Sequence, residues 1–385
     1  MSHLVSDVII AGGGLAGCLI AWRLAETQPG LRIALVEKGA ALGGEHTWSF
    51  HGPDLTFAQF EWLLPVVEGH WPRQEVRFPR AQRVLETSYH SVRSTRLARK
   101  VREFPGITVL TEEATEIRSG AVSLKGGQML QAPVVLDTRG AGPAELGPCG
   151  YQKFFGLDVE LDAPHGLAHP VLMDALVPQT DGFRFFYLLP WTSTRLLIEE
   201  TLYSSRAELD VSRSREAILA YAARAGWKIR AVEREEAGVL PIPLKAIPEL
   251  GSPGVCAAGV RAGLFHYVTG YSLPWAVATA EAVARVGAGE RTQAAVASAI
   301  AQVQRSSLTD RGYWIALNRM LFLAAGEGDA ARLRIFERFY GLDRALIERF
   351  YRGELRWRDC LRIVAGKPPV PVVRALRSLF TEGFA

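Results

Sequence analysis

Residues 7–37 read DVIIAGGGLAGCLIAWRLAETQPGLRIALVE, and this stretch decides the fold. The apolar run Val8–Ile10 predicts a short strand that ends at a glycine-rich turn, GGGLAG at 12–17. Helical spacing follows over residues 15–27, and residues 31–36 return to a strand pattern. The order of strand, glycine turn, helix and strand predicts the first βαβ unit of a dinucleotide-binding fold.

The glycines of this turn have separate physical tasks. Gly12 allows the tight turn, Gly14 lets the backbone approach a pyrophosphate, and Gly17 lets the helix pack closely on the strand. The phosphate charge is then expected at the N-terminus of the helix, where Leu15 and Ala16 form the first turn.

An acidic residue ends the second predicted strand. Glu37 lies twenty residues beyond Gly17, where a carboxylate accepts hydrogen bonds from ribose hydroxyls and repels a 2′-phosphate. This position favours FAD or NAD over NADP.

Length and composition limit the class of protein. With 385 residues, 48% of them apolar, the chain is expected to form two connected domains or one large α/β body. The net charge of +4 is small, so it does not indicate a nucleic-acid partner. The four cysteines form neither a CxxC pair nor a cluster with histidines, which predicts a reducing cytoplasm and no metal site. We expect no signal peptide and no transmembrane helix, so any membrane contact is expected at the surface.

The segment that follows Glu37, residues 38–51, holds three glycines and then aromatic and imidazole groups. It is too irregular for a strand, and we predict a loop over the cofactor. The alternative is a connector that Trp48 and Phe50 fasten to the core. Three residues of this loop are candidate cofactor contacts: Lys38, Gly44 and His46.

Two later turns complete the predicted cofactor site. The strand at 134–136 ends at Asp137, on the edge where doubly wound sheets bind ligands; the alternative for Asp137 is a turn or cap residue. A short strand at 255–259 precedes a helix whose start is marked by Ser272 and Pro274. This second helix N-terminus is expected to face the cofactor, with four candidate contacts around it: Gly259, Gly270, Tyr271 and Ser272.

The remaining pattern predicts an α/β fold with an interleaved second domain. Strands are expected at 74–79, 107–110, 151–160, 183–201 and 230–239, a hairpin at 116–130, and helices at 54–68, 94–103 and 208–226. A Rossmann-type FAD-binding domain would comprise about 1–55, 92–150 and 252–300, and a substrate domain with a mostly antiparallel sheet about 56–91 and 151–251. Residues 301–385 would form a helical, basic C-terminal region.

The C-terminal region is rich in arginine. Residues 332–377 carry twelve Lys and Arg against five Asp and Glu. An apolar helix face rimmed with arginine is what an interfacial helix presents to anionic lipid. The alternative is ordinary helix packing with a solvated basic face.

Two adjacent carboxylates interrupt an apolar strand, LLIEETLY at 196–203. Because successive side chains of a strand point to opposite faces, Glu199 and Glu200 cannot share one role. The one on the covered face would keep its proton near neutral pH and could act as a general acid. The alternative is that both are exposed charges of an edge strand.

Seven segments together resemble the bacterial lycopene β-cyclase family, and they occur in matching order along nearly the whole chain. They are GGGLAG at 12–17, GGEHTWSFH at 43–51, PHGLAHPVLMDA at 164–175, LLIEETLY at 196–203, GLFHYVTGYSLP at 263–274, LNRMLFLA at 317–324 and GKPPVP at 366–371. The resemblance implies a flavoprotein fold that binds FAD and an acyclic carotenoid, lycopene, as substrate. It also implies that the flavin must be reduced, with NAD(P)H as external reductant, although the reaction has no net redox change.

The resemblance also gives the acidic pair its roles. Glu199 is the candidate acid that protonates a terminal double bond of a ψ end group, and Glu200 is a supporting or outward-facing carboxylate. Closure of the six-membered ring and loss of a ring proton give the β end, so that lycopene becomes β-carotene through γ-carotene. Reduced flavin beside the cation would stabilise it electrostatically. One departure from the wider flavoprotein pattern is that residues 259–263 lack the acidic residue usual beside the ribityl chain.

A hydrocarbon substrate reaches such an enzyme from a bilayer. We therefore expect a cytoplasmic protein attached peripherally to the inner face of the membrane; the sequence carries no signal for an oligomeric state. Two other readings share the fold: an FAD-dependent monooxygenase or prenyl-lipid reductase, which would consume NAD(P)H steadily, and a non-catalytic nucleotide-binding scaffold of a carotenoid complex. The buried carboxylate would have no evident use in either.

Overall fold

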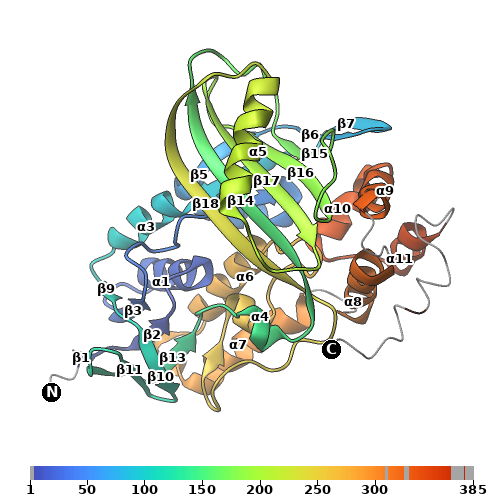
Figure 1. Cartoon of the computed structure of the whole chain (residues 1–385). Helices are drawn as coiled ribbons and strands as arrows, with labels where there is room; N and C mark the ends of the chain where they lie inside the picture. The colour runs from blue at the N-terminus through green and yellow to red at the C-terminus, as the bar shows by residue number, and fades with distance from the viewer. Residues whose placement is uncertain (1–3, 308–310, 325–328, 366–376, 378–385) are drawn as a thin grey trace.

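The computed structural model describes residues 4–307, 311–324, 329–365 and 377 (Figure 1). A five-stranded parallel sheet has the order β19-β13-β2-β3-β9. Its strands are β2 (Val8–Ala11), β3 (Ile33–Glu37), β9 (Ile107–Thr111), β13 (Val134–Asp137) and β19 (Cys256–Ala257). Helix α1 (Leu15–Thr27) follows β2 directly, so the predicted βαβ unit is confirmed. The glycine turn follows β2, the middle strand of this sheet, which lies between β13 and β3.

A separate small sheet packs against the parallel one near the N-terminus (Figure 1). It has the order β1-β12-β11-β10, with β1 (Leu4–Val5), β10 (Ala114–Arg118), β11 (Ala121–Leu124) and β12 (Met129–Gln131). The predicted hairpin around residues 126–127 is confirmed as β11 and β12, and β10 adds a second hairpin before it.

The largest sheet has seven strands in the order β18-β14-β17-β16-β15-β6-β7, and every pair is antiparallel except β15 with β6. Its strands are β6 (Gln74–Phe78), β7 (Ala81–Leu85), β14 (Cys149–Leu161), β15 (Val171–Asp174), β16 (Phe183–Pro190), β17 (Arg195–Ser204) and β18 (Ile229–Pro243). This agrees with the mostly antiparallel second sheet expected from the sequence. The exact domain boundaries stay a prediction.

The two faces of this sheet have different neighbours. Leu196 and Ile198 of β17 pack with Ile218 of helix α5 (Val211–Arg224), which lies across the sheet in Figure 1. Leu197 and Tyr203 instead join the main core that runs through the parallel sheet. Alternate residues of β17 therefore face α5 or the interior between the two sheets.

One predicted loop is wrong over part of its length. Within residues 38–51, Thr47–His51 form β4, which pairs along its whole length with β8 (Tyr89–Arg93), while β5 (Val67–Trp71) pairs with the other edge of β8. The strand is stabilised by a partner about forty residues later in the chain, so the irregular glycine-rich segment before it gave no local signal of pairing.

The helices close the two sheets. The short helices are α2 (Phe57–Leu63), shorter than the predicted 54–68, α3 (Ser94–Arg102) and α4 (Pro143–Leu146). The longer ones are α6 (Leu273–Ala284), which packs against α1, and α7 (Gln293–Ser306). The C-terminal ones are α8 (Arg311–Arg319), continued by a π-helical turn at Met320–Ala324, α9 (Asp329–Tyr340), α10 (Arg344–Arg352) and α11 (Trp357–Val364). Short 3₁₀ turns lie at Gly52–Asp54, Leu64–Val66, Gly259–Ala262 and Ala288–Glu290.

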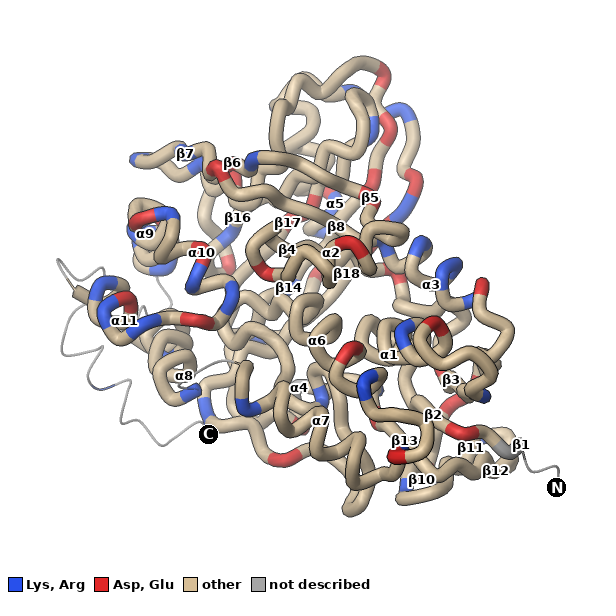
Figure 2. Tube along the Cα trace, turned by 180° about the vertical axis from the view of Figure 1, so that it is seen from behind, with Lys and Arg blue, Asp and Glu red and all other residues tan. Residues whose placement is uncertain are grey.

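The C-terminal helices α8 to α11 gather on one side of the molecule (Figures 1 and 2). In the ranges that the structure covers, none of the helices combines the length and apolar character needed to cross a bilayer. The segment GKPPVP at 366–371 and the last part of the basic stretch 332–377, except Arg377, lie outside the described residues.

Candidate active site

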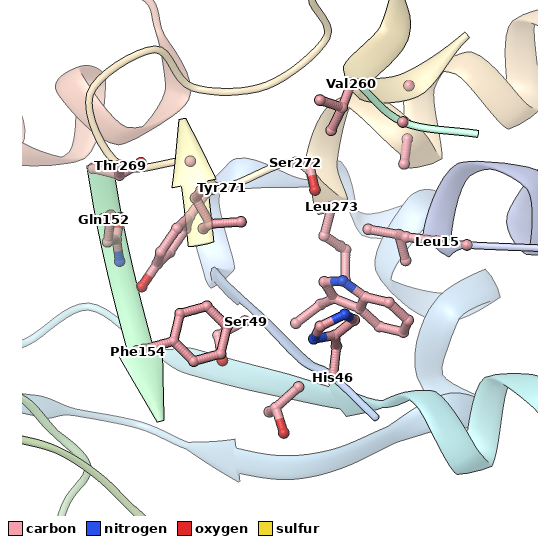
Figure 3. A pocket seen from close by; sticks show the side chains of 18 of the residues that line it. Leu15, His46, Ser49, Gln152, Phe154, Val260, Thr269, Tyr271, Ser272 and Leu273 are labelled. Atoms are coloured by element: carbon pink, nitrogen blue, oxygen red, sulfur yellow. The ribbon is translucent and has the colours of Figure 1, made fainter. Parts of the chain in front are cut away.

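A cavity of about 410 Å³ lies where the glycine turn meets the seven-stranded sheet. Figure 3 shows Gln152 and Phe154 of β14 on one side of it and Leu15, His46 and Leu273 on the other. The volume is within the roughly 300–1,000 Å³ of small-molecule sites. Segments that are distant in the sequence, between Gly12 and Tyr351, therefore converge on one cavity.

The glycine turn has room only on its cavity side. A Cβ at Gly17 would lie 2.0 Å from the Gly12 carbonyl oxygen, and one at Gly12, where φ is +109°, would lie 2.6 Å from the Thr138 carbonyl carbon. Gly14 differs, because a Cβ built there meets nothing within 4 Å and the residue lines the cavity. The turn thus packs tightly below and leaves open space above, as a backbone that receives a pyrophosphate requires.

Two helix N-termini face the cavity. The N-cap residues are Gly14 for α1 and Ser272 for α6, and neither N-terminus is capped by a side-chain hydrogen bond. Leu15 and Ala16 of α1 and Leu273 of α6 line the cavity. Uncapped backbone N–H groups and the positive ends of both helix dipoles favour an anionic ligand. These features fit a dinucleotide whose pyrophosphate lies at α1.

Glu37 ends β3 at the edge of the same cavity. Its Oε2 accepts a hydrogen bond from the backbone N–H of Gly13 at 2.7 Å, and its Oε1 accepts one from Gly39 at 2.8 Å. Both bonds fix the orientation of the carboxyl group. A fixed negative charge here suits ribose hydroxyls and disfavours a 2′-phosphate.

Most of the candidate cofactor contacts line the cavity. They are Gly12, Gly14, Leu15, Ala16, Glu37, His46, Gly259, Gly270, Tyr271 and Ser272. Burial lowers the pKa of His46, so its imidazole is neutral at pH 7.

Four candidates are not among the described residues that line the cavity. These four are Gly17, Lys38, Gly44 and Asp137. Gly17 lies beneath the turn. Gly43 and Gly140, which are close in sequence to Gly44 and Asp137, line the cavity instead. The buried Asp137 carboxylate forms ion pairs with Arg139 at 2.9 Å and Arg261 at 3.0 Å. Asp137 therefore holds the loop after β13 rather than facing the cavity itself.

Glu199 points into the cavity from β17. Strand register places it in a row across one face of the sheet, with Tyr187 of β16 on one side and Gly156 of β14 and then Glu236 of β18 on the other. The Thr201 hydroxyl donates a hydrogen bond to Glu199 Oε1 at 2.6 Å. Burial raises the pKa of Glu199 well above its usual value, and the nearby Glu236 carboxylate raises it further. The side chain can therefore carry a proton at neutral pH.

Glu200 faces the other side of the sheet. Arg184 Nε donates a hydrogen bond to its Oε1 at 2.5 Å, and the residue lines a separate charged cavity with Lys153 and Asp181. Strand alternation therefore separates the two carboxylates as predicted, and the alternative of two exposed edge-strand charges is wrong because both are buried.

Phenol groups surround the space in front of Glu199. The Tyr187 hydroxyl contacts Ser49 Oγ at 2.8 Å and the Tyr89 hydroxyl at 2.9 Å, and Tyr89 contacts Tyr271 at 2.6 Å. Burial raises the pKa of all three tyrosines well above 10, so the hydroxyls stay neutral. The rings of Tyr187 and Tyr271, which line the cavity, can stabilise a cation without placing a charge beside it.

Other aromatic residues near the cavity differ in what they contact. Trp48 and Phe185 line the cavity, whereas Phe186 stacks on Tyr221 of α5 with ring centroids 4.1 Å apart and Trp191 packs on Trp71. Only the first two can contact a ligand in this cavity.

The sequence analysis did not single out Thr201, Glu236, Tyr340 or Tyr351. Thr201 could have been found, because a residue two positions from Glu199 shares its face of the strand. Glu236 lies in the charged run REE at 234–236, where no local pattern distinguishes it. Tyr340 of α9 and Tyr351 of α10 line the cavity only through tertiary packing.

Solved structures with the same architecture are distant in sequence. A geranylgeranyl bacteriochlorophyll reductase-like protein from Thermoplasma acidophilum matches with a TM-score of 0.61 at 14% identity, over 98% of this chain and 100% of that one. PqsL, a probable FAD-dependent monooxygenase from Pseudomonas aeruginosa, matches with a TM-score of 0.55 at 16% identity, over 91% of this chain and 98% of that one. These matches show a Rossmann-type α/β fold.

Similarity in sequence is closer and covers the full length. A lycopene beta-cyclase from Pantoea ananas is 44% identical over 97% of this chain and 98% of its own. A lycopene beta-cyclase from Pseudescherichia vulneris is also 44% identical, over 97% of this chain and 96% of its own. The model of the lycopene cyclase protein family matches residues 7–377. The chain therefore belongs to the lycopene cyclase family.

Proposed function

We propose that this protein is an FAD-dependent lycopene β-cyclase that converts the ψ ends of lycopene into β rings. The observation that carries the proposal is a buried carboxyl group, Glu199, that faces the cavity beside the glycine turn and is disposed to stay protonated. The family match and the two bacterial relatives named lycopene beta-cyclase support it. A protonated carboxyl in an aromatic cavity is the group that an acid-initiated cyclisation needs.

In the proposed reaction Glu199 donates its proton to the terminal double bond of the ψ end. The neighbouring double bond attacks the resulting tertiary carbocation, and the new carbon–carbon bond closes the six-membered ring. A ring carbon then releases a proton, which returns the Glu199 carboxylate to its acid form directly or through solvent. One proton is taken up and one is released, so atoms and charge balance without an oxidant or reductant. The neutral rings of Tyr187 and Tyr271 line this space and can stabilise the cation. Glu200, held by Arg184 on the other face, has a supporting role only.

The cavity beside the two helix N-termini would hold FAD. We propose Gly14, Leu15 and Ala16 for the pyrophosphate, Glu37 for the ribose, and the turn Gly270–Ser272 for the flavin side. Gly12, His46 and Gly259, which also line the cavity, are further proposed contacts. Gly17 and Asp137 act indirectly, through the packing of the turn and the position of the loop after β13, and contacts from Lys38 and Gly44 stay predictions. Reduced FAD supplies negative charge that stabilises a cation in a dry site, and NAD(P)H is proposed as its external reductant.

We further propose a cytoplasmic protein that attaches to the inner face of the membrane through α11. Trp357, Leu361 and Val364 repeat at helical spacing, and Trp357 and Leu361 are 67% and 57% exposed. Arg358 and Arg362 are exposed on the same helix, and Figure 2 shows further basic residues on the neighbouring helices α9 and α10. Exposed apolar side chains beside arginines suit an anionic lipid surface.

The function is tested by anaerobic incubation with lycopene and chemically reduced FAD. Because cyclisation has no net redox change, we expect β rings in large excess over the reductant consumed, measured by chromatography of the carotenoids. Consumption of one reducing equivalent for each molecule converted would instead assign a reductase or an oxygenase.

Replacement of Gly14 by valine should abolish flavin binding without unfolding the protein. A Cβ at this position meets no protein atom within 4 Å, and the valine side chain would occupy the space proposed for the pyrophosphate. Flavin absorbance and the thermal midpoint of the apoprotein are the measurements. Gly287→Val, an exposed glycine whose Cβ also meets nothing within 4 Å, is the control and should keep its flavin. Normal flavin content in Gly14→Val would contradict the cofactor assignment.

Glu199→Gln should lower the cyclisation rate by about 10²–10⁴-fold, the usual effect of removing a general acid. Glu200→Gln is the matched control and should have a milder effect, because its side chain faces Arg184. Since the acid works protonated and burial raises its pKa, the rate of the unmodified protein should fall only as pH rises through that raised pKa. Full activity in Glu199→Gln would exclude Glu199 as the general acid of the reaction.

Attachment through α11 is tested by flotation with liposomes that contain anionic lipid. Trp357→Ser with Leu361→Ser, and separately Arg358→Gln with Arg362→Gln, should each reduce the floated fraction several-fold. Leu219→Ser, an exposed apolar residue of α5 that is distant from α11 in Figure 1, should float like the unmodified protein. Equal flotation of all variants would leave α11 as ordinary surface.

A further inference from the structure

A third carboxylate lies beside the proposed acid. Glu236 of β18 is buried, and both Glu199 and Glu236 are register partners of Gly156, from opposite sides. A Cβ at Gly156 would lie 3.2 Å from Glu236 Cγ and 3.4 Å from Glu199 Cβ. Because Gly156 has no side chain, no group of β14 separates the two carboxyl groups on this face of the sheet.

The two carboxyl groups have unequal partners. Glu236 Oε2 accepts a hydrogen bond from the Thr47 hydroxyl at 2.8 Å and lies 2.9 Å from Arg234 Nη2. In the described part of the chain, the Glu199 side chain forms no ion pair, and the Thr201 hydroxyl donates a hydrogen bond to it. The cationic partner of this pair of carboxyl groups therefore contacts Glu236 and not Glu199.

The surrounding charges balance without Glu199. Asp158 of β14 forms ion pairs with Arg93 of β8 and, at 3.7 Å, with Arg234. Burial lowers the pKa of Arg93 to about 10, which leaves it charged at pH 7. Two arginines therefore face two carboxylates, those of Asp158 and Glu236. Arg93 is also close enough to Glu68 and Arg195 to interact with them, and these two charges are opposite in sign. Tyr187 and His46, which also face the cluster, are neutral.

An ionised Glu199 would add one uncompensated charge to this buried cluster, which is strongly unfavourable. We propose that Glu236 is a positioning residue for the acid. Glu236 carries the negative charge of the pair, which Arg234 and Thr47 stabilise, so the proton of the pair stays on Glu199, and Glu199 faces the cavity. The pairing stands on the geometry alone, whereas the use of the proton for ring closure rests on the proposed function.

The proposal predicts how the acid titrates. Glu199 loses its proton as pH rises, and the negative charge of Glu236 opposes that loss, so Glu236→Gln should move the titration of Glu199 to lower pH by about one unit or more. Glu236→Asp keeps the negative charge, so the titration midpoint of Glu199 should stay close to that of the unmodified protein. Arg234→Gln removes the compensating positive charge and should shift the midpoint the opposite way.

The measurement is an infrared pH titration of the flavin-loaded protein, with the carboxylic acid C=O band of Glu199 identified as the band that Glu199→Gln removes. The control is Glu235→Gln, next in the chain, whose side chain is partly exposed and pairs with Arg215 at 2.5 Å. It should leave the midpoint unchanged. Flavin content and thermal midpoint establish that each variant is folded, and Glu236→Asp and Arg234→Gln still test the pair if Glu236→Gln does not fold.

The expected result is a lower titration midpoint of Glu199 in Glu236→Gln. The alkaline limb of the pH–rate profile for cyclisation should move to lower pH by the same amount. A midpoint equal to that of the unmodified protein, or the same sign of shift in Glu236→Gln and Arg234→Gln, would overturn the proposal. The titration does not need turnover. A protein that shows the shift but does not cyclise lycopene would therefore retain the pair and lose the proposed function.

Discussion

The pairing of β14 with β17 on one side and β18 on the other is the constraint on which the site depends. It places Glu199 and Glu236, nearly forty residues apart in sequence, on either side of Gly156. Because side chains alternate along a strand, a slip of one residue between β14 and β17 would turn Glu199 toward α5 and Glu200 toward the cavity. The apolar neighbours prevent this: Leu196 and Ile198 fit the core under α5, and Leu197 fits the main core. Ordinary core packing thus fixes which carboxyl group can meet a ligand.

The parts of the site that depend on local geometry could be predicted from the sequence. The turn from Gly12 to Gly17 and the helix after it follow from backbone sterics within a dozen residues, and the opposite directions of Glu199 and Glu200 follow from strand alternation. The parts that depend on distant pairing could not. β4 forms because β8 offers a partner, Glu236 matters because of its register with β14, and Tyr340 and Tyr351 reach the cavity from helices near the other end of the chain. No window of sequence contains those contacts.

The C-terminal helices are tied to the sheet that carries the acid. Arg332 of α9 donates hydrogen bonds to the carbonyl oxygens of Tyr203, at 3.2 Å, and Leu321, also at 3.2 Å. Arg80, in the turn between β6 and β7, pairs with the largely buried Glu337. Helix α9, which carries Tyr340 of the cavity lining, is thereby part of the same packed unit as the seven-stranded sheet.

The charges of this protein fall into two electrostatic classes. Asp158 and Glu236 are buried and Arg93 and Arg234 are largely buried, so salt screens this cluster little; Arg358 and Arg362 on α11 are exposed and are screened over about 8–10 Å at physiological ionic strength. Added salt should therefore weaken the proposed contact of α11 with anionic lipid and change the titration of Glu199 little. Ionic strength is thus a variable that separates access to the cavity from the chemistry inside it.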